Sequence, residues 1–371
     1  MKKRIIFIIT IVSILSCSYP SEKVFPKDKW LEVKPEEVGI DSQTLNKAVN
    51  FLKLNSGRNG IDELMIIRNG RLIFKGDSVD KVHGVWSCTK SFTSTVLGLL
   101  IDDNKTQLNT LAKTILPEMA VTYPEVNLFH FSTMTSGYKA VGDTATTGYT
   151  HGSSSTPFSP GSPPLFEPGT KYAYWDAAMN QFANILTHIA TEPLDEFFKH
   201  RIADPIGMNE KAWKWLDFGE IDGLKVVGGA GNKSNGIYIS ANELARFGLL
   251  FLNEGNWDGT QLISSDWIKQ ATKNQVPVKL ELGSHLSETY GMGVYGYNWW
   301  VNGIQANGAR LWPNAPEGTY AASGHNNNKM FIINEWNMVI VRLGLDAKDV
   351  TISDSAWNEF LGKIRDSLKN R

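Results

Sequence analysis

Short apolar runs near both ends of the chain have the length and composition of strands. Glu63 to Arg68 and Arg71 to Lys75 flank Asn69-Gly70. This dipeptide supplies the positive φ angles that a two-residue hairpin turn requires. Near the other end, Lys329 to Ile333 and Met338 to Leu343 form a second pair of apolar runs. The pattern predicts one sheet built from both ends of the chain.

Helical spacing dominates between and after these runs. Residues 240–243 (SANE) form a capping-box pattern ahead of an amphipathic run, and residues 353–368 are amphipathic as well. Residues 152–164 contain 12 Gly, Ser, Thr or Pro in 13 positions, a composition typical of a loop. We therefore expect one α/β domain over residues 30–371, in which helices flank an antiparallel sheet. A mostly helical insertion is expected at about residues 105–290.

The first residues have the composition of an export signal. Basic residues at positions 2–4 precede an apolar run at 5–15, which is too short to span a membrane. The four residues ending at Cys17 (ILSC) resemble a bacterial lipobox, in which the cysteine is lipidated. The expectation is a signal peptide at 1–16, and a lipidated Cys17 with its tether at 17–29. A plain signal peptide with an incidental cysteine is the alternative.

This pattern predicts an exported bacterial lipoprotein on the cell membrane or outer membrane, facing the periplasm or the exterior. Its membrane partner would be reached through the N-terminal lipid, since each buried CH₂ of an acyl chain contributes about 0.8 kcal/mol. No later segment has 18 uninterrupted apolar residues. The expected domain would therefore be held by its lipid alone.

Composition excludes several classes of protein. The chain has 371 residues, of which 42% are hydrophobic, and 37 Lys and Arg balance 38 Asp and Glu. Removal of residues 1–16 takes away three positive charges and leaves a mature chain near −4, which argues against nucleic-acid binding. Two cysteines cannot form a disulfide framework, and the seven histidines include no H-E-x-x-H pair. No metal site or cofactor is expected.

The candidate chemistry centres on Ser87. Ser87 and Lys90 lie three residues apart at the start of a helical run, so both side chains can point into one cleft. A nearby unprotonated amine can activate a serine hydroxyl as a nucleophile. The S-x-x-K spacing also arises by chance, and then Ser87 would be a capping residue and Lys90 a surface lysine.

Other catalytic motifs are missing from the sequence. It contains no G-x-S-x-G nucleophile elbow and no G-x-x-x-x-G-K-[ST] phosphate loop. Cys88 lies about 100° around the helix from Ser87 and is expected to be a small buried residue. Four aromatic residues close together in the sequence would line an acyl or sugar pocket or pack in the core, namely Tyr295, Tyr297, Trp299 and Trp300.

From Ser87 onward the chain resembles the serine β-lactamase and penicillin-binding-protein superfamily. The closest likeness is to its class C-related branch, which holds esterases, D-amino-acid peptidases and 6-aminohexanoate-oligomer hydrolases. The likeness covers roughly residues 30–365 and implies a β-lactamase/transpeptidase-like fold. The stretches that carry it are SCTKSFTSTVLGLLIDD (87–103), TMTSGY (133–138), PGTKYAYWDAAMNQFANIL (168–186), IADPIGM (202–208), ISANELARFGLLFLNEGNWDG (239–259), YGYNWW (295–300) and YAASGHNNNKMFIIN (320–334).

The resemblance assigns roles to individual residues. It makes Ser87 the acylated nucleophile, Lys90 its general base, and Tyr174 the tyrosine that moves the proton to the leaving group. A phenol with a pKa of about 10 can act as a base only beside a cation, and Lys90 is expected to provide that charge. Asp176 stands where the family usually has Asn. As a carboxylate it would bind Lys90 and favour the protonated lysine.

After S-x-x-K and the motif at Tyr174 to Asp176, the family has a third motif, and here the sequence differs more from the family. The family's Lys/His-Thr-Gly falls on Ala322-Ser323-Gly324, so the cation that helps hold a substrate carboxylate is missing from its usual position. His325 follows directly. Its imidazole would replace that cation, or its backbone N–H would complete the oxyanion hole with that of Ser87. We expect the backbone role, because neighbouring strand residues face opposite ways.

Together these observations predict an exported serine hydrolase that cleaves a small-molecule ester or amide through an acyl-enzyme on Ser87. Asp176, Ser323, Gly324 and His325 would bind the substrate or its oxyanion. A true β-lactamase or D,D-peptidase is one alternative. A non-catalytic binding protein on the same fold is the other, and the residues at 176 and 322 are the features that favour it.

Overall fold

The computed structural model describes residues 23–143, 156–232, 235–283 and 290–369. The signal peptide expected at 1–16 and the lipidation site at Cys17 lie outside these residues. The same holds for the tether up to residue 22 and for part of the loop expected at 152–164. No helix in the described ranges is long and apolar enough to cross a membrane.

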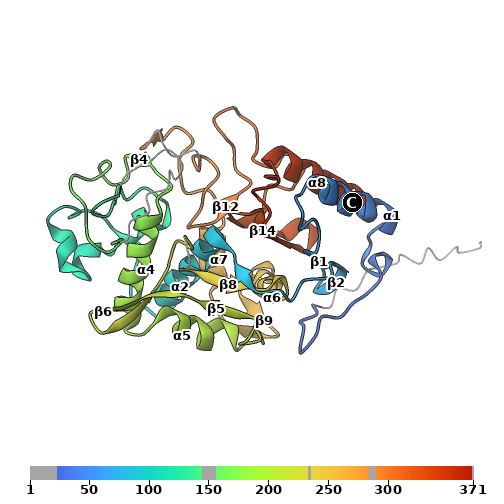
Figure 1. Cartoon of the computed structure of the whole chain (residues 1–371), viewed down its shortest axis with the longest axis horizontal. Helices are drawn as coiled ribbons and strands as arrows, with labels where there is room; N and C mark the ends of the chain where they lie inside the picture. Colours follow the sequence, from blue (N-terminus) through green and yellow to red (C-terminus); the bar gives the residue numbers. More distant parts are fainter. Residues whose placement is uncertain (1–22, 144–155, 233–234, 284–289, 370–371) are drawn as a thin grey trace, which may run out of the picture.

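A six-stranded antiparallel sheet forms one side of the molecule, in the order β12-β13-β14-β15-β1-β2 (Figure 1). The predicted hairpin is confirmed, the second pair of apolar runs forms two paired strands, and pairing of β1 with β15 joins the two ends of the chain. The strands are β1 (Glu63–Arg68), β2 (Arg71–Lys75), β12 (Trp300–Val301), β13 (Tyr320–Gly324), β14 (Asn328–Ile333) and β15 (Met338–Leu343).

The sequence of β1 explains both its turn and its central place. Asn69 and Gly70 adopt φ angles of 52° and 73°, the left-handed values that join β1 to β2. Leu64 and Ile66 pack into the core on one face of the sheet, while Met65 and Ile67 belong to the core on the other face. A strand buried on both faces is apolar at nearly every position, as this one is.

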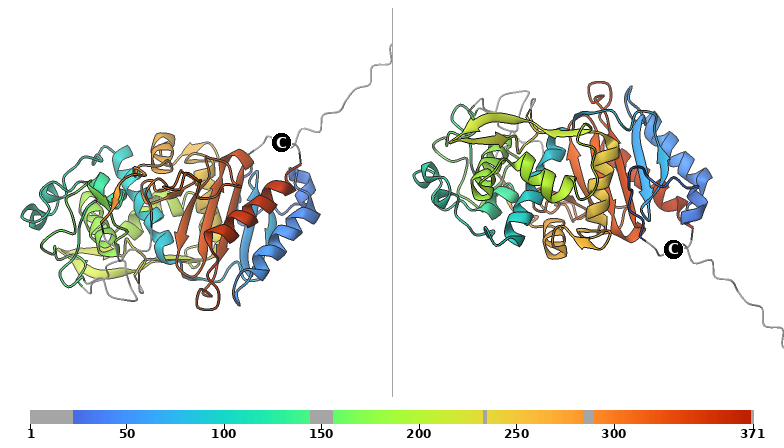
Figure 2. Two further views of the ribbon diagram at one scale, coloured as in Figure 1. Left: turned by 90° about the horizontal axis from the view of Figure 1, so that it is seen from above. Right: turned by 90° about the horizontal axis from the view of Figure 1, so that it is seen from below.

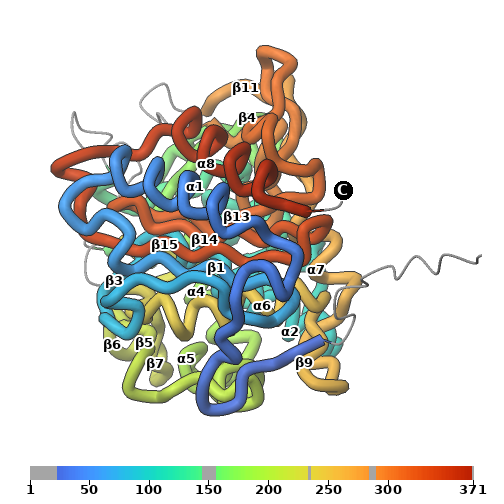
Figure 3. The backbone as a smooth tube through the Cα atoms, turned by 90° about the vertical axis from the view of Figure 1, so that its right-hand side faces the viewer, coloured from blue at the N-terminus to red at the C-terminus, as the bar shows by residue number. Residues whose placement is uncertain are grey.

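Helices cover both faces of the sheet (Figures 2 and 3). Helices α1 (Ser42–Leu54) and α8 (Asp354–Ser367) pack together over one face, and α6 (Ala241–Leu252) packs against β14 and β15 on the other. The Ser240 hydroxyl caps α6 by accepting from the Glu243 N–H at 3.3 Å. Helix α6 falls within the helical insertion expected at about 105–290, and it packs against the large sheet.

A second lobe lies beside the sheet and is built around α2 (Thr89–Asp102) and α4 (Asp176–Ala190). Its other helices are α3 (Leu128–Ser132), α5 (Leu194–Phe198) and α7 (Ser265–Ala271). Small sheets accompany them, formed by β3 (His83–Gly84), β4 (Lys171–Tyr172), β5 (Trp213–Trp215), β6 (Asp217–Ile221), β7 (Leu224–Val227), β8 (Ile237–Ile239), β9 (Asn256–Trp257), β10 (Thr260–Gln261) and β11 (Glu281–Leu282). Apart from β6, these strands have two to four residues, too few to produce a periodic apolar pattern, and β6 is mostly exposed or half-buried, so the sequence did not reveal them.

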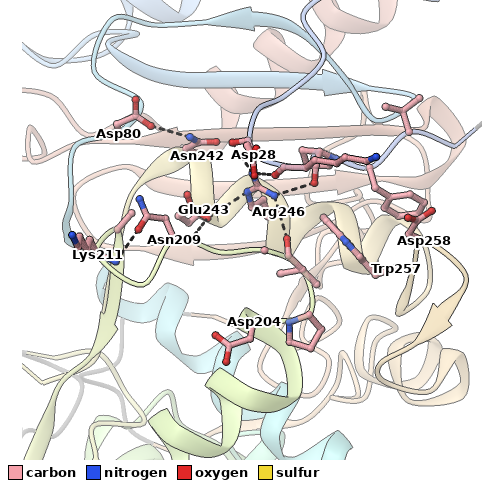
Figure 4. A pocket seen from close by; sticks show the side chains of 18 of the residues that line it. Asp28, Asp80, Asp204, Asn209, Lys211, Asn242, Glu243, Arg246, Trp257 and Asp258 are labelled. Atoms are coloured by element: carbon pink, nitrogen blue, oxygen red, sulfur yellow. Dashed lines mark hydrogen bonds and ion pairs between the residues drawn. The ribbon is translucent and has the colours of Figure 1, made fainter.

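The segment of residues 23–28 passes α6 and is held there by Arg246 of that helix (Figure 4). The buried guanidinium donates to the backbone carbonyls of Pro26, Lys27 and Ile206 at 3.1, 2.7 and 3.2 Å. A pocket of about 970 Å³ lies between this segment and the body of the protein. Ser87 and its neighbours do not line it.

Candidate active site

Ser87 lies in a tight turn between β3 and α2. The turn is a single 3₁₀ turn, Trp86–Cys88, and α2 begins directly after it at Thr89. Trp86 has a φ angle of 53°, in the left-handed region that non-glycine residues rarely adopt. Such strain costs roughly 1–3 kcal/mol and persists only where the surrounding structure holds it. The turn thus places Ser87 at the start of α2, as the S-x-x-K spacing predicts.

Lys90 reaches from the first turn of α2 back to Ser87. Its side chain is buried, and Nζ lies 2.9 Å from Ser87 Oγ, 2.8 Å from Asp176 Oδ1 and 2.9 Å from the carbonyl oxygen of Ala230. A carboxylate, a carbonyl and a hydroxyl oxygen match the three N–H groups of an ammonium. The surroundings therefore suit a protonated lysine, as expected from the aspartate at position 176.

Tyr174 and Asp176 approach Ser87 from the start of α4. Asp176 is the first residue of that helix, where the positive end of the helix dipole favours a carboxylate. Tyr174 is buried, and its side chain is hydrogen-bonded to Ser87. Its ring centre lies 4.6 Å from Lys90 Nζ, within the range of a cation–π contact. The structure thus brings Ser87, Lys90, Tyr174 and Asp176 into one cluster.

The pKa of Tyr174 moves in the direction opposite to that expected from the sequence. Burial raises it well above its usual value, and the neighbouring Asp176 carboxylate raises it further, while the hydrogen bond with Ser87 lowers it. The expectation that Lys90 would make this phenol a ready base was therefore wrong. Since Asp176 binds Lys90 directly, it offsets the charge that would stabilise a phenolate. In the free protein Tyr174 is a neutral hydroxyl.

The end of β13 passes very close to the Ser87 turn. A Cβ atom at position 324 would lie 2.1 Å from the carbonyl oxygen of Val85 and 3.1 Å from the backbone nitrogen of Ser87. Only glycine fits at this distance, which explains the glycine that closes the third motif. Ser323 is half-buried beside it, and Ala322 is fully buried. The structure thus brings Gly324 to Ser87 without a cation at position 322.

His325 follows β13, and its side chain is exposed. The ring packs edge-on against Trp86, with 5.2 Å between ring centres, and partial burial lowers its pKa below the usual value. The imidazole is therefore uncharged at neutral pH. Lys329, the partner of Ser323 in register, does not provide a cation either, because its ammonium lies over the rings of Trp312, Phe331 and Trp357 at 5.4–5.5 Å.

Sequence reasoning missed two residues around the cluster, Ala230 and Asn180. Ala230 contributes its carbonyl to Lys90, and its own N–H donates to Asn180 Oδ1 at 3.1 Å. Trp300 stacks on Tyr174, with ring centres 6.0 Å apart. A backbone carbonyl carries no signal in a sequence. Asn180 lies four residues after Asp176 and thus on the same helical face, which was a usable signal.

Most of the aromatic residues near position 297 belong to the core. Tyr295, Tyr297 and Trp299 are buried, and Trp300 is partly exposed. Cys88 is buried as expected, and burial raises the pKa of its thiol to about 12. Within the described ranges, no three His, Cys, Asp or Glu side chains are placed to hold a metal ion.

Comparisons with known proteins concern first the fold. Three solved structures superpose on most of the chain. A family VIII carboxylesterase has a TM-score of 0.64 at 14% identity, over 92% of this chain and 99% of that one, and EstCE1, a hydrolase with promiscuous acyltransferase activity, has a TM-score of 0.64 at 17% identity, over 88% of this chain and 99% of that one. A penicillin-binding protein homologue from Caulobacter crescentus has a TM-score of 0.62 at 14% identity, over 89% of this chain and 99% of that one. At these identities the likeness shows a shared fold.

Sequence comparison adds one relative and a family. An uncharacterized protein of Alkalihalophilus pseudofirmus is 28% identical over 112 residues, which cover 30% of this chain and 31% of that protein. The match thus spans about a third of the relative. The Beta-lactamase family model matches residues 58–347, a range that holds the Ser87 turn, α4 and β13. The chain therefore belongs to the β-lactamase family of hydrolases.

Proposed function

We propose that this protein is a serine hydrolase that cleaves an ester or amide through an acyl-enzyme on Ser87. The observation that carries the proposal is the contact of Lys90 Nζ with Ser87 Oγ at 2.9 Å, inside a cluster completed by Tyr174 and Asp176. Ser87 Oγ attacks the substrate carbonyl carbon and forms a C–O bond. Loss of the alcohol or amine leaves the acyl-enzyme, which water then hydrolyses.

The proton path follows from the charge state of the cluster. Lys90 as an ammonium cannot accept a proton, so it first passes one to Asp176 Oδ1, which lies 2.8 Å away. The neutral amine then takes the proton of Ser87 as Oγ attacks. Tyr174, a neutral phenol, donates its proton to the leaving group and is reprotonated by Lys90. Asp176 returns its proton to Lys90, and the net transfer runs from Ser87 to the leaving group.

The oxyanion of the tetrahedral intermediate would be bound by backbone N–H groups of Ser87 and His325. The close approach of Gly324 to the nitrogen of Ser87 supports this, because His325 is the next residue along the chain. Two such donors stabilise the negative charge that develops on the carbonyl oxygen, and removal of one typically costs 10²–10³ in kcat. The imidazole of His325 has no part in this step.

The charges near Ser87 favour substrates without a carboxylate. Ala322 has replaced the family's cation, His325 is neutral, and the charge of Lys90 is neutralised by Asp176. An anionic substrate such as a β-lactam or a D,D-peptide would find no free positive charge among these residues. An uncharged ester or amide requires none, so the esterase or amidase activity is favoured over the lactamase.

Active-site labelling tests the proposal. The purified protein is treated with a fluorophosphonate probe, and the modified peptide is identified by mass spectrometry. We expect Ser87 to be labelled in the wild type, no labelling in Ser87→Ala, and full labelling in the control Ser91→Ala, since the Ser91 hydroxyl bonds the carbonyl of Asn298 instead. An unlabelled wild type would support the non-catalytic binding protein.

Substrate turnover separates the two hydrolase classes. p-Nitrophenyl acetate, which is uncharged, should be hydrolysed at a rate that Ser87→Ala abolishes. A chromogenic cephalosporin, which carries a carboxylate, should be a poor substrate. The opposite preference would identify a true β-lactamase.

Export and lipidation are inferred from the N-terminal pattern. A chain expressed in a bacterium with labelled palmitate should become labelled and fractionate with membranes, and Cys17→Ser should abolish both. Labelling that is independent of Cys17, or a soluble exported product, would leave a plain signal peptide.

A further inference from the structure

We infer that a small pocket next to Trp86 is a substrate subsite that accepts one small apolar group of the ester or amide. The inference rests on the proposed function, whose substrate it specifies further. The pocket has a volume of about 180 Å³. At about 30 Å³ for a group the size of a water molecule, it has room for roughly six non-hydrogen atoms.

Two of the residues that line the pocket are sequence neighbours of groups in the Ser87 cluster. Trp86, which lines it, directly precedes Ser87, and Gly231, on the opposite segment, directly follows Ala230. The Ala230 carbonyl is the one that Lys90 Nζ contacts. Consecutive Cα atoms are 3.8 Å apart, so both walls lie one residue from the groups that would perform the reaction.

The larger side chains that line the pocket are mainly apolar, and the glycines in the lining add no side chains. Trp86, Ile237, Tyr238 and Leu345 contribute the larger side chains. A Cβ at Gly231 would lie 2.0 Å from the carbonyl oxygen of Trp86, so no side chain can project there. The width of the pocket is therefore set by the four larger side chains, which favour an apolar guest.

Few polar side chains line the pocket, and that of His83 already has hydrogen-bond partners. His83 lines it, but its Nε2 lies 2.7 Å from Glu63 Oε2 and its Nδ1 lies 3.0 Å from the carbonyl oxygen of Gly84. Among the described residues that line the pocket there is no Asp, Glu, Lys or Arg, and Asn235 adds one amide. Among these described residues, a charged group would lose its hydration without gaining a partner.

Leu345 offers the cleanest test, because it lines the pocket and is 36% exposed, so its replacement should leave the fold intact. Leu345→Trp narrows the pocket and Leu345→Ala widens it. The control Leu54→Trp makes the same substitution at an 84% exposed leucine at the end of α1, which does not line the pocket. One arm of the experiment compares p-nitrophenyl acetate with p-nitrophenyl hexanoate. The other arm compares ethyl acetate with benzyl acetate.

In one of the two arms, we expect Leu345→Trp to lower kcat/KM for the larger ester at least tenfold more than for the smaller ester. That arm identifies whether the acyl group or the alcohol enters. Leu345→Ala should move the preference the other way, and the control Leu54→Trp should not change it. Equal effects on large and small esters in both arms, or no effect, would overturn the subsite.

Fluorophosphonate labelling of Ser87 in the same variants keeps the two proposals apart. Labelled protein with an unchanged ester preference contradicts the subsite alone. A wild type that neither labels nor hydrolyses any of the four esters contradicts the proposed function itself.

Discussion

Lys90 Nζ and Asp176 Oδ1 lie 2.8 Å apart, and the two side chains are only 1% and 3% exposed. Each charge has lost nearly all of its hydration and depends on the other for compensation. A buried pair of this kind adds little net stability, but loss of one partner leaves an uncompensated charge in the interior. The family's usual asparagine at position 176 would accept the same hydrogen bond without the charge. The aspartate therefore changes the electrostatics of the cluster more than its geometry.

Two replacements of Asp176 should separate the effect of its charge from the effect of its hydrogen-bond acceptor. Asp176→Leu leaves the Lys90 ammonium unpaired, and we expect the free energy of unfolding to fall by about 3–5 kcal/mol. Asp176→Asn keeps an acceptor at Oδ1 and should cost less. Urea denaturation of the wild type and both variants at neutral pH measures the difference. Equal losses for the two variants would mean that the lost charge, which both share, accounts for the whole effect and the acceptor at Oδ1 for none of it.

Tyr174 should remain a protonated phenol until strongly alkaline pH. Its pKa is raised well above the usual value, so the wild type and Tyr174→Phe should show the same increase in tyrosinate absorbance between about pH 7 and 10. The variant should nevertheless lose about 10²–10⁴ in kcat for ester hydrolysis, because the leaving group loses its proton donor. A larger tyrosinate signal in the wild type over this pH range would indicate that Tyr174 ionises and acts as the base.

His325 should act through its backbone. His325→Ala keeps the N–H and should stay within several-fold of wild-type kcat, whereas His325→Pro removes that donor and should lose about 10²–10³. Steady-state kinetics on p-nitrophenyl acetate, with circular dichroism to check folding, measures both. If alanine is as damaging as proline, the imidazole itself contributes.

The lowered pKa of His325 also predicts a direction for acid sensitivity. The unfolded chain takes up a proton near pH 6.5, while the folded protein takes it up only at lower pH. This group's contribution to stability is therefore present above pH 6.5 and is lost as the pH falls below it. His325→Ala should show a smaller loss of unfolding free energy than the wild type between about pH 7 and 5. An identical pH dependence would contradict this.

Cys88 should be unreactive in the folded protein. Burial raises the pKa of its thiol to about 12, so almost no thiolate exists at about pH 8. In a Cys17→Ser background, which leaves one cysteine, iodoacetamide should modify Cys88 only after unfolding in urea. Rapid modification of the native protein at this pH would show that the Ser87 turn opens readily.

Gly324→Ala should displace β13 from the Ser87 turn. Its Cβ would lie 2.1 Å from the backbone oxygen of Val85, and that atom cannot move as a flexible side chain can. We expect a loss of at least about 100-fold in kcat, because misplacement by about 1 Å is enough for such an effect. Gly308→Ala is the control, since no atom lies within 4 Å of its Cβ position and its cost is limited to the backbone strain of a φ of 80°. Comparable losses in both variants would point to a general effect of methyl addition.

The parts of the structure that follow from local chemistry were predictable. Asn69-Gly70 determines its own turn, and Ser87 and Lys90 meet because residues three apart share a helical face. The direction of the Tyr174 pKa was not predictable in this way. It depends on how deeply the ring is buried and on a carboxylate that neutralises Lys90, and both are properties of the folded chain.

Local sequence likewise could not predict the segments that complete the site. Ala230 contributes a carbonyl, a group that every residue has, so only the folded chain shows which carbonyl reaches Lys90. The small sheet of β3, β8 and β5 consists of strands of two or three residues, shorter than any periodic signal. The position of α6 against the large sheet likewise depends on which apolar surfaces meet.

The pairing of β1 with β15 has a consequence for the nascent chain. Domains fold as units during synthesis, which proceeds from the N-terminus. The Ser87 turn emerges early, but β13 to β15 occupy residues 320–343 of 371 and emerge late. Until they arrive, β1 is paired on one edge alone, with β2, and Gly324 is not yet beside Ser87. Translation therefore delivers the nucleophile long before it can be used, and a chain truncated ahead of β13 should carry Ser87 as an inert serine.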